Sequence, residues 1–328
     1  MCFVTSRAIA PDTFARLPLS APPKSGYCLV PMHAPDPITE TITARLAALH
    51  AGQRLSAWSL IVSFLGDAIG PRGGVVSAGA LQTLMQRLGV GHGAVRTALS
   101  RLAADGWIER DREGRNSFYR LSGDVVETVL SAERRIYAQS SLLPAGAPRS
   151  LVIAPAPLPD ATLDLIEAAG ALQLSPQVFV CFAAVSGLPA ALYLPGATVA
   201  QTTALTPGAA MLNAMEHARQ AAEMARLHAA YLPVAATLKA GPAPPPEDAM
   251  ALRCLMIHEW RRLALRVLAI PADLVQPTDP EPETRALIAA IYARLLPASE
   301  NWLDANASTP SRPLPPPDAR LARRFGGG

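Results

Sequence analysis

One stretch, residues 91–121, constrains the fold most, because a helical pattern passes directly into a strand, a turn and a second strand. In its helical part, 92–104, apolar residues recur at helical spacing and form a single face: Val95, Ala98, Leu99 and Leu102. The opposite face carries small and polar residues with arginines beside them: Gly93, Thr97, Ser100, Ala104, Arg96 and Arg101. The stretch therefore predicts a helix that buries one face and leaves a small, polar and basic face outside.

Gly106 ends this helix, and a β-hairpin is predicted to follow it. The first strand begins at Trp107, and the chain turns at Glu113-Gly114 before the second strand. Arginines are spread along the hairpin: Arg110, Arg112, Arg115 and Arg120. A helix with small side chains can enter a DNA major groove, and a basic hairpin beside it can lie along phosphates or in the minor groove. The order predicts a winged helix-turn-helix.

The preceding segments complete the same pattern. Asp36-Pro37 is a typical helix start, and Ser56 can cap a second helix. Val75-Val76 then fits a short strand, and Ala80–Leu88 fits the next helix. We expect residues 36–122 to form a DNA-binding domain in which the helix described above is the recognition helix.

Residues 1–35 follow no helical or strand pattern. The first 31 residues lack the charged start and apolar centre of a signal peptide. We expect this extension to be a disordered arm or an over-extended reading frame, with the natural start near Met32.

Two groups of residues are predicted to contact DNA. The helix contributes Gly93, Arg96, Thr97, Ser100 and Arg101, and the end of the hairpin contributes Arg112, Arg115 and Asn116. The alternatives are a solvated helix face and strand-edge charges that discourage aggregation, since Glu109, Asp111 and Glu113 alternate with the arginines. Residues 51–121 hold nine Arg against five Asp and Glu, whereas the whole chain has a net charge of +3, so the positive charge is concentrated in this segment.

The same region contains a competing motif. Residues 89–94, Gly-Val-Gly-His-Gly-Ala, match the dinucleotide-binding pattern G-x-G-x-x-A. That pattern requires a strand before it, whereas residues 84–88, Leu-Met-Gln-Arg-Leu, are typical of a helix. We therefore interpret the glycines as a turn between two helices.

Beyond residue 122 we expect a connector, an α+β domain and a helical domain. Asp124 and Glu127 are spaced as a capping box that opens a connecting helix. The central domain combines predicted strands and helices in an α+β, ferredoxin-like pattern: strands at 151–154, 178–185 and 191–194, and helices near 160–170 and 210–230. The expected segments are a connecting helix and linker at 123–149, a central α+β domain at 150–240, a C-terminal helical domain at 247–304 and a disordered tail at 305–328.

Composition argues against several other classes of protein. Half of the residues are apolar and 17% are charged, which is typical of a globular chain with a hydrophobic core. The four cysteines lie far apart and form no C-x-x-C pair, which favours a reduced, cytoplasmic setting over a metal site or disulfides: Cys2, Cys28, Cys181 and Cys254. No apolar run reaches membrane-spanning length, and the sequence shows no G-x-S-x-G elbow, P-loop or convincing carboxylate pair. We therefore expect neither an enzyme nor a cofactor.

Two patches of the sequence resemble a known family. The runs SLIVSFLGDAIGPRGG and AVRTALSRLAADGWIERDREGRNSFYRL, within 56–121, resemble the N-terminal part of the PaaX-like family of phenylacetic-acid catabolism repressors. RCLMIHEWRRLALRVLAIPADL with the later ENWL, within 250–304, resembles the C-terminal domain of the same family. The resemblance implies a repressor with a Cas2-like, ferredoxin-fold middle domain. That middle domain normally carries tryptophans, and residues 140–245 hold none.

A basic cluster in the C-terminal patch is the candidate effector site. His258-Glu259 begins the H-E-x-x-H zinc motif, but Arg262 replaces the second histidine, so no zinc site is predicted. His258, Arg261 and Arg262 lie on adjacent helical turns. The alternatives are a salt-bridged or solvated helix face and a dimer contact. The functional interpretation is an anion-binding surface for the phosphates of an acyl-CoA effector.

The leading hypothesis is a homodimeric repressor that binds double-stranded operator DNA and is released by a small effector. The family resemblance favours phenylacetyl-CoA or another aryl-CoA as that effector. One alternative is a metal-dependent nuclease of Cas2-like fold, which would need an aspartate at the end of the first central strand, where Ala154-Pro155 follows instead. The other is a DNA-binding adaptor that senses no effector.

Overall fold

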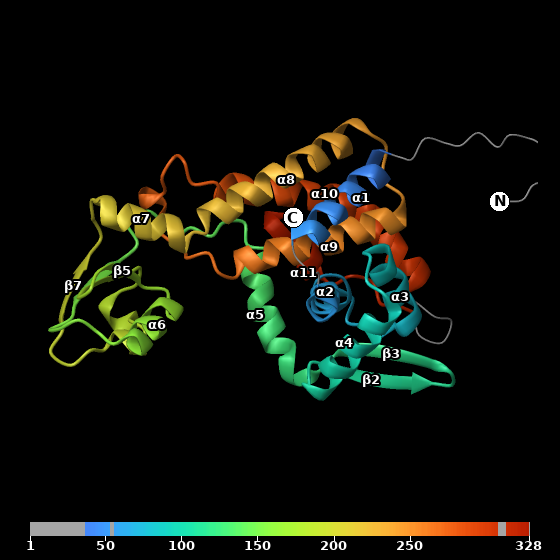
Figure 1. Cartoon of the computed structure of the whole chain (residues 1–328), viewed down its shortest axis with the longest axis horizontal. Helices are drawn as coiled ribbons and strands as arrows, with labels where there is room; N and C mark the ends of the chain where they lie inside the picture. The colour runs from blue at the N-terminus through green and yellow to red at the C-terminus, as the bar shows by residue number, and fades with distance from the viewer. Residues whose placement is uncertain (1–36, 53–55, 308–312, 328) are drawn as a thin grey trace, which may run out of the picture. The chain divides into compact units, whose positions relative to one another are not determined.

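The computed structural model describes residues 37–52, 56–307 and 313–327, and these ranges belong to one compact unit. The described part combines many helices with two small antiparallel sheets, so the predicted α+β class is confirmed (Figure 1). The predicted extension at 1–35 and the helix start at Asp36 lie outside the described residues. No helix in the described ranges is long and apolar enough to cross a membrane.

The N-terminal elements follow the predicted order. They are α1 (Pro37–Gly52), α2 (Ala57–Phe64) with its continuations η1 (Leu65–Ile69) and η2 (Gly70–Arg72), β1 (Val76–Ser77), α3 (Ala78–Arg87), α4 (His92–Ala104), β2 (Ile108–Glu113) and β3 (Asn116–Leu121). Ser56 caps α2, as predicted, by accepting a hydrogen bond from the Ser59 backbone at 3.4 Å. The short strand lies one residue later than predicted, because Ser77 is both its last residue and the cap of α3.

The first sheet places β3 between β1 and β2, with all pairs antiparallel. Val76 pairs with Tyr119, and Ile108 pairs with Leu121 at the base of the hairpin. The segment before the G-x-G-x-x-A motif is helix α3, and Gly89 has a φ of +74° in the turn that leads to α4. The interpretation as an interhelical turn is therefore confirmed for Gly89 and Gly91, whereas Gly93 lies in the first turn of α4.

The connector differs from its prediction at its start. Asp124 lies inside a 3-10 turn, η3 (Gly123–Val125), and α5 (Val126–Ile136) begins only after it. Val125 is consequently the cap residue and supplies no side-chain hydrogen bond, so the predicted capping box of Asp124 and Glu127 is wrong.

The central segment is an antiparallel sheet with a helix on each face. Its elements are β4 (Arg149–Ile153), α6 (Asp160–Ala168), β5 (Leu172–Ser175), β6 (Val178–Cys181), the 3-10 turns η4 (Val185–Gly187) and η5 (Ala190–Leu192), β7 (Thr198–Thr202) and α7 (Ala209–Ala218). The strand order is β5-β6-β4-β7. Val152 and Phe179 pack with Ile166 of α6, whereas Val180 packs with Met211 and Met215 of α7.

The predictions for the central segment are wrong at several places. Residues 191–194 form a turn rather than a strand, because Pro189 and Pro195 flank the apolar run and prevent regular pairing. Two edge strands, β5 and β7, were not predicted, and β7 has no run of large apolar residues. The strand expected at 178–185 ends at Cys181. The helix expected at 210–230 is two helices, α7 and α8 (Ala221–Ala240), because Gln220 between them adopts a positive φ of 56°.

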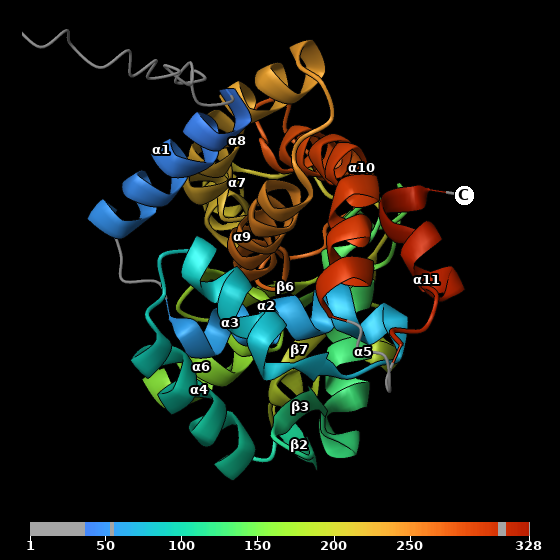
Figure 2. The same cartoon turned by 90° about the vertical axis from the view of Figure 1, so that its right-hand side faces the viewer.

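The C-terminal helices share one hydrophobic core with the N-terminal elements. They are α9 (Pro246–Ala264) and α10 (Glu281–Asn306), joined through the 3-10 turn η6 (Ala272–Leu274). Helix α9 is buried on nearly every side and packs against α1, α2, α3, α8 and α10 (Figures 1 and 2). Ile38, Leu60 and Leu255 belong to the same core cluster. Segments 36–122 and 247–304, expected as separate domains, therefore lack separate cores.

The predicted disorder of 305–328 is wrong for residues 313–327. They include α11 (Ala319–Ala322) and a last 3-10 turn, η7 (Arg324–Gly326). Leu321 and Arg324 are buried. A composition rich in Pro, Arg and Gly is typical of disorder, but here the arginines bind acidic residues far away in the sequence.

Candidate functional site

Helix α4 buries the predicted apolar face and exposes the predicted basic one. The buried residues are Val95, Ala98, Leu99 and Leu102. The five predicted DNA-contacting residues of α4 are all exposed: Gly93, Arg96, Thr97, Ser100 and Arg101. Because α4 packs on α2 through its apolar face, the polar face is held outward by the core.

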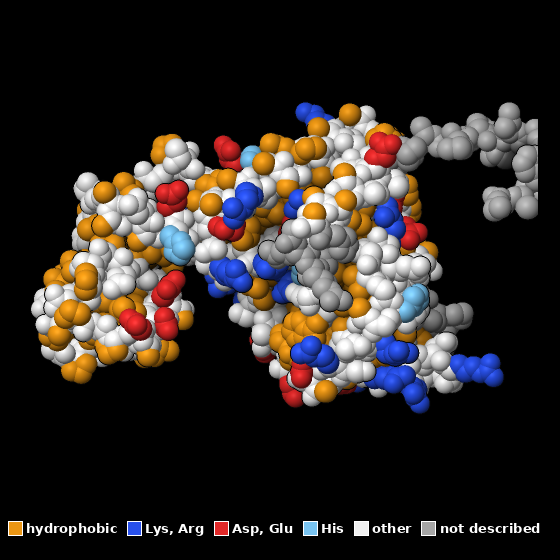
Figure 3. Space-filling model, in the orientation of Figure 1, with side chains coloured by type: hydrophobic (Ala, Val, Ile, Leu, Met, Phe, Trp, Pro, Cys, Tyr) orange, Lys and Arg blue, Asp and Glu red, His pale blue; other side chains and the backbone are white. Residues whose placement is uncertain are grey.

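The hairpin presents three further predicted residues at its tip, where Gly114 turns with a φ of +60°. Arg112, Arg115 and Asn116 are exposed. Figure 3 shows Lys and Arg side chains gathered over the hairpin and the adjoining part of α4. The exposed face of α4 and the tip of the hairpin therefore both carry basic side chains.

The hairpin arginines divide into two kinds. Arg110 donates hydrogen bonds to the Ser117 hydroxyl at 2.7 and 3.2 Å, and Arg120 pairs with Glu109. The hydrogen bond from Arg120 lowers the pKa of the Glu109 carboxyl below its ordinary value. Arg112 and Arg115 have no side-chain hydrogen bond or ion pair to any residue that the structure describes. The strand-edge interpretation thus fits Arg120, and Arg112 and Arg115 are available to a partner.

His258 and Arg261 of α9 are held against α2. Nδ1 of His258 lies 3.2 Å from the Ser63 hydroxyl, and Arg261 donates to the same hydroxyl at 2.6 Å. Arg261 also donates to the hydroxyl of Ser59 at 2.6 Å. Burial lowers the pKa of His258 to about 4, and the nearby charges of Arg261 and Arg262 act in the same direction. The imidazole is therefore neutral at pH 7, and both side chains brace α2.

A cavity of about 830 Å³ opens beside these residues. Its walls come from α1, from the start of α2, and from α8 and α9. The charged residues of the lining are Arg45, Arg226, Arg262, Arg266, Glu223 and Glu259 together with the neutral His258. Two of the arginines are paired inside the lining, Arg45 with Glu259 and Arg226 with Glu223. Four arginines against two glutamates leave an excess of positive charge.

The structure separates the three predicted effector residues. His258 and Arg262 line the cavity, and Arg261 does not. The prediction missed Arg45 of α1 and Arg226 of α8, which the fold brings to the same cavity from positions far away in the sequence. The detectable signal was weak, because each of these two helices carries a single arginine.

The described residues contain no group of three or more His, Cys, Asp or Glu side chains that could hold a metal ion. Strand β4, where a nuclease of the alternative hypothesis would carry its aspartate, ends at Ile153 and continues into Ala154-Pro155. Cys181 and Cys254 are buried free thiols, and Cys2 and Cys28 lie outside the described residues.

Comparison with known proteins finds family matches in two segments of the chain. Residues 56–125 match the family model for PaaX-like protein, and residues 216–305 match that for the PaaX-like protein C-terminal domain. The Transcriptional repressor PaaX of Escherichia coli (strain K12) is 29% identical over 289 residues, which cover 83% of this chain and 91% of that protein. The solved structure of uncharacterized protein Rv0674 from Mycobacterium tuberculosis covers 76% of this chain and 99% of its own, with 17% identity and a TM-score of 0.46.

These matches define an α+β homologue of a transcriptional repressor. The chain is similar to the PaaX-like family in both matched segments, and the resemblance seen in its sequence is confirmed.

Proposed function

We propose that this protein is a transcriptional repressor that binds double-stranded operator DNA through a winged helix-turn-helix. The main observation behind the proposal is the exposed, basic face of α4 next to the hairpin. The arginines at the hairpin tip have no partner among the described residues. The element order α2, β1, α3, α4, β2 and β3 supports this assignment, with β2-β3 as the wing. The repressor homologue supports the same function.

The central segment is proposed to have a ferredoxin-like fold. If β4, β5, β6 and β7 are numbered one to four along the chain, their order across the sheet is 2-3-1-4. All neighbouring strands are antiparallel, and α6 follows the first strand. This order supports the ferredoxin-like assignment, although 3-10 turns replace the second crossover helix.

Replacing Thr97 or Ser100 by alanine should change which base pairs are preferred. These exposed hydroxyls lie on the face of α4 that would enter the major groove, and each lost base contact is worth roughly 1–3 kcal/mol. Affinity for a panel of operator variants measures the change. Ser131→Ala on the exposed side of α5 is the control. Unaltered selectivity in both α4 variants would show that α4 does not read bases in the major groove.

Replacing Arg112 or Arg115 by alanine should weaken binding to all DNA sequences equally. Each lost phosphate contact reduces the slope of log affinity against log salt by about one unit. Titrations at several salt concentrations measure the slope. Lys239→Ala, which removes an exposed charge from α8, is the matched control. A slope equal to that of the control would show that the hairpin arginines do not touch phosphates.

The protein is further proposed to act as a homodimer. One recognition helix reads only a few base pairs, so adequate specificity requires two half-sites roughly 34 Å apart. Sedimentation of the protein with its operator is expected to give two chains per site. One chain per site would contradict this part of the proposal.

The cavity between α1, α2, α8 and α9 is the proposed effector site. Its volume of about 830 Å³ lies within the range of ligand sites, and its excess of arginine suits the phosphates of phenylacetyl-CoA or another aryl-CoA. For release, the effector must bind the non-operator conformation more tightly, and a hundredfold preference corresponds to about 2.7 kcal/mol. The cavity borders α2, on which α4 packs, so ligand binding can reach the DNA-binding helix through a direct contact.

Footprinting on the protein's own upstream DNA, with and without phenylacetyl-CoA, tests the function as a whole. Protection that the thioester abolishes is the expected result. Arg262→Ala and Arg266→Ala should weaken thioester binding by roughly tenfold or more in calorimetry, because a hydrogen bond to a charged group contributes roughly 1.5–3 kcal/mol. Arg134→Ala, on α5 outside the cavity lining, should not. If no aryl-CoA changes the affinity for DNA, the alternative of a DNA-binding adaptor without an effector is favoured.

A further inference from the structure

The described part of the C-terminal tail, residues 313–327, is attached to the rest of the protein through few anchors. Of its side chains only Leu321 and Arg324 are buried, and most of the others are exposed. Figure 2 shows α11 at the edge of the compact unit, next to α10. We call residues 313–327 the tail segment. Few buried anchors on an otherwise exposed stretch are typical of a docked peptide.

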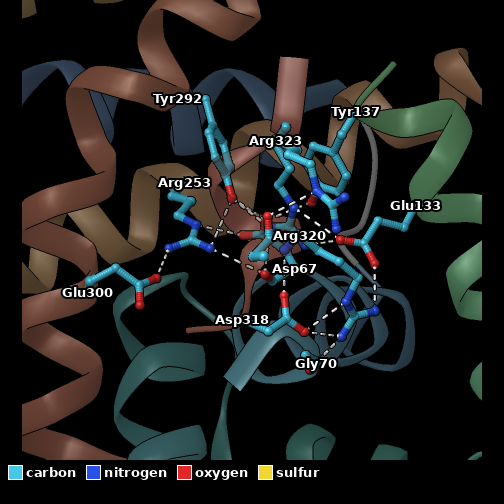
Figure 4. Close-up of polar contacts among 12 residues, drawn as sticks. Asp67, Gly70, Glu133, Tyr137, Arg253, Tyr292, Glu300, Asp318, Arg320 and Arg323 are labelled. Atoms are coloured by element: carbon cyan, nitrogen blue, oxygen red, sulfur yellow. Dashed lines mark hydrogen bonds and ion pairs between the residues drawn. The ribbon is translucent and has the colours of Figure 1, made fainter. Parts of the chain in front are cut away.

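Arg324 is a deeply buried anchor, and its side chain is 2% exposed. Its guanidinium donates to the Asp67 carboxylate at 2.8 Å, to the Tyr292 hydroxyl at 2.6 Å and to Glu133 at 2.8 Å. The same group lies 3.9 Å from the centre of the Tyr137 ring. These four residues, Asp67, Glu133, Tyr137 and Tyr292, form the socket. Figure 4 shows them converging from η1, from α5 and its C-terminal cap, and from α10.

The next residue, Phe325, completes the anchor. Its ring packs edge-on against Tyr137 and Tyr292, with centroid distances of 5.3 and 5.6 Å. Its backbone N–H donates to the Tyr137 carbonyl at 2.8 Å. Phe325 has a φ of +55°, which L residues rarely adopt, so the socket contacts must hold it in this conformation.

Arg320 fixes the register of the tail segment one helical turn earlier. It donates to Glu133 at 3.1 Å and to the carbonyl of Gly70 at 3.2 Å. The backbone N–H of Asp318 donates to the carbonyl of Pro71 at 2.8 Å. The tail segment thus contacts η2, which follows α2, and α5, which follows the hairpin.

The charges show that the socket suits a basic peptide. Asp67 has an internal partner, Arg253, at 2.7 Å. Glu133, by contrast, is largely buried, and within the described residues its carboxylate pairs only with Arg320 and Arg324. Without the tail segment, the Glu133 carboxylate would lose both cations. A buried carboxylate is costly without a paired cation, and both cations of Glu133 come from the tail segment. The socket therefore favours a peptide that carries arginines at these positions.

We propose that the tail segment is an intramolecular peptide ligand, recognised through Arg320, Arg324 and Phe325, which docks in the socket and clamps the connector helix α5 against the end of α2. Because α5 leaves the base of the hairpin, the docked tail also restrains the position of the hairpin. This inference does not depend on DNA binding.

Hydrogen exchange of the full-length chain tests the clamp. Arg324→Ala should speed amide exchange in residues 126–137 and 65–72 by about tenfold or more, because the contacts between them are lost. Arg323→Ala is the matched control, since Arg323 is exposed and, among the described residues, its side chain donates only to the carbonyl of Ala319 within its own segment. Equal exchange in the two variants would overturn the proposal. Arg320→Ala provides a milder variant if Arg324→Ala does not fold.

A peptide added in trans distinguishes a docked ligand from an ordinary core contact. A synthetic peptide of residues 313–327 should restore protection of 126–137 in the full-length variant, Arg324→Ala or Arg320→Ala, and should not change the wild-type protein, whose socket is occupied. The same peptide carrying both Arg320→Ala and Arg324→Ala is the control. Failure of the wild-type peptide to restore protection at millimolar concentration, or restoration by the control peptide, would overturn the assignment as a ligand.

Discussion

Replacing Asp67 by asparagine is expected to lower the free energy of unfolding by about 3–5 kcal/mol. The carboxylate is buried and pairs with Arg253 at 2.7 Å and Arg324 at 2.8 Å, and asparagine keeps its shape but leaves both guanidinium groups without this anion. Chemical denaturation measures the loss. Asp164→Asn, at an exposed position of α6, is the control, and an equal denaturation midpoint in both variants would contradict the prediction.

The same carboxylate should make the free energy of unfolding of the wild-type protein decrease in acid. Burial raises the pKa of Asp67, but the charges of Arg253 and Arg324 outweigh burial and hold it below the ordinary value. A depressed folded-state pKa adds stability that is present above the unfolded-state pKa of about 3.9 and is lost as the pH falls through the lower folded-state value. The difference in stability between the wild type and Asp67→Asn should therefore shrink below about pH 4.

Trp260→Ala is expected to cost about 3–5 kcal/mol of the free energy of unfolding. The Trp260 ring is fully buried in α9, its Nε1 donates to the Ile136 carbonyl at 2.8 Å, and the Arg285 guanidinium lies 4.9 Å from the ring centre. Alanine therefore leaves a cavity and an unpaired carbonyl at the end of α5. Thermal and chemical denaturation measure the loss.

Trp260→Phe separates the two contributions. Phenylalanine fills much of the space but cannot donate to Ile136, so about 1–3 kcal/mol should remain lost. A phenylalanine variant as unstable as the alanine variant would show that the hydrogen bond, rather than the packing, dominates at this position.

The elements that could be predicted from the sequence are those defined by neighbouring residues. Helix α4 was predictable because its apolar residues repeat within a few turns, and the hairpin because Gly114 permits the positive φ of its turn. Strand β7 was missed because nearly all of its residues are exposed, so this edge strand has neither a run of large apolar residues nor an apolar alternation.

The unpredicted parts of the site depend on contacts across long stretches of chain. Arg45 and Glu259 pair although they are 214 residues apart, and Arg324 reaches Asp67 over 257 residues. Sequence patterns report which face of a helix is apolar, but not which distant helix covers it. For this reason His258 and Arg261 could be grouped with Arg262 as one anion site, although the fold uses the first two to brace α2.

The shared core of α2 and α9 also limits how this protein can be divided. Leu60, Ile61 and Phe64 of α2 are fully covered, and α2 packs directly on α9. A fragment that stops after the hairpin would present these side chains to water and would tend to aggregate. The proposed DNA-binding part is therefore not a portable module, and a chimera designed to change operator choice should exchange the outer face of α4 while retaining the chain around it.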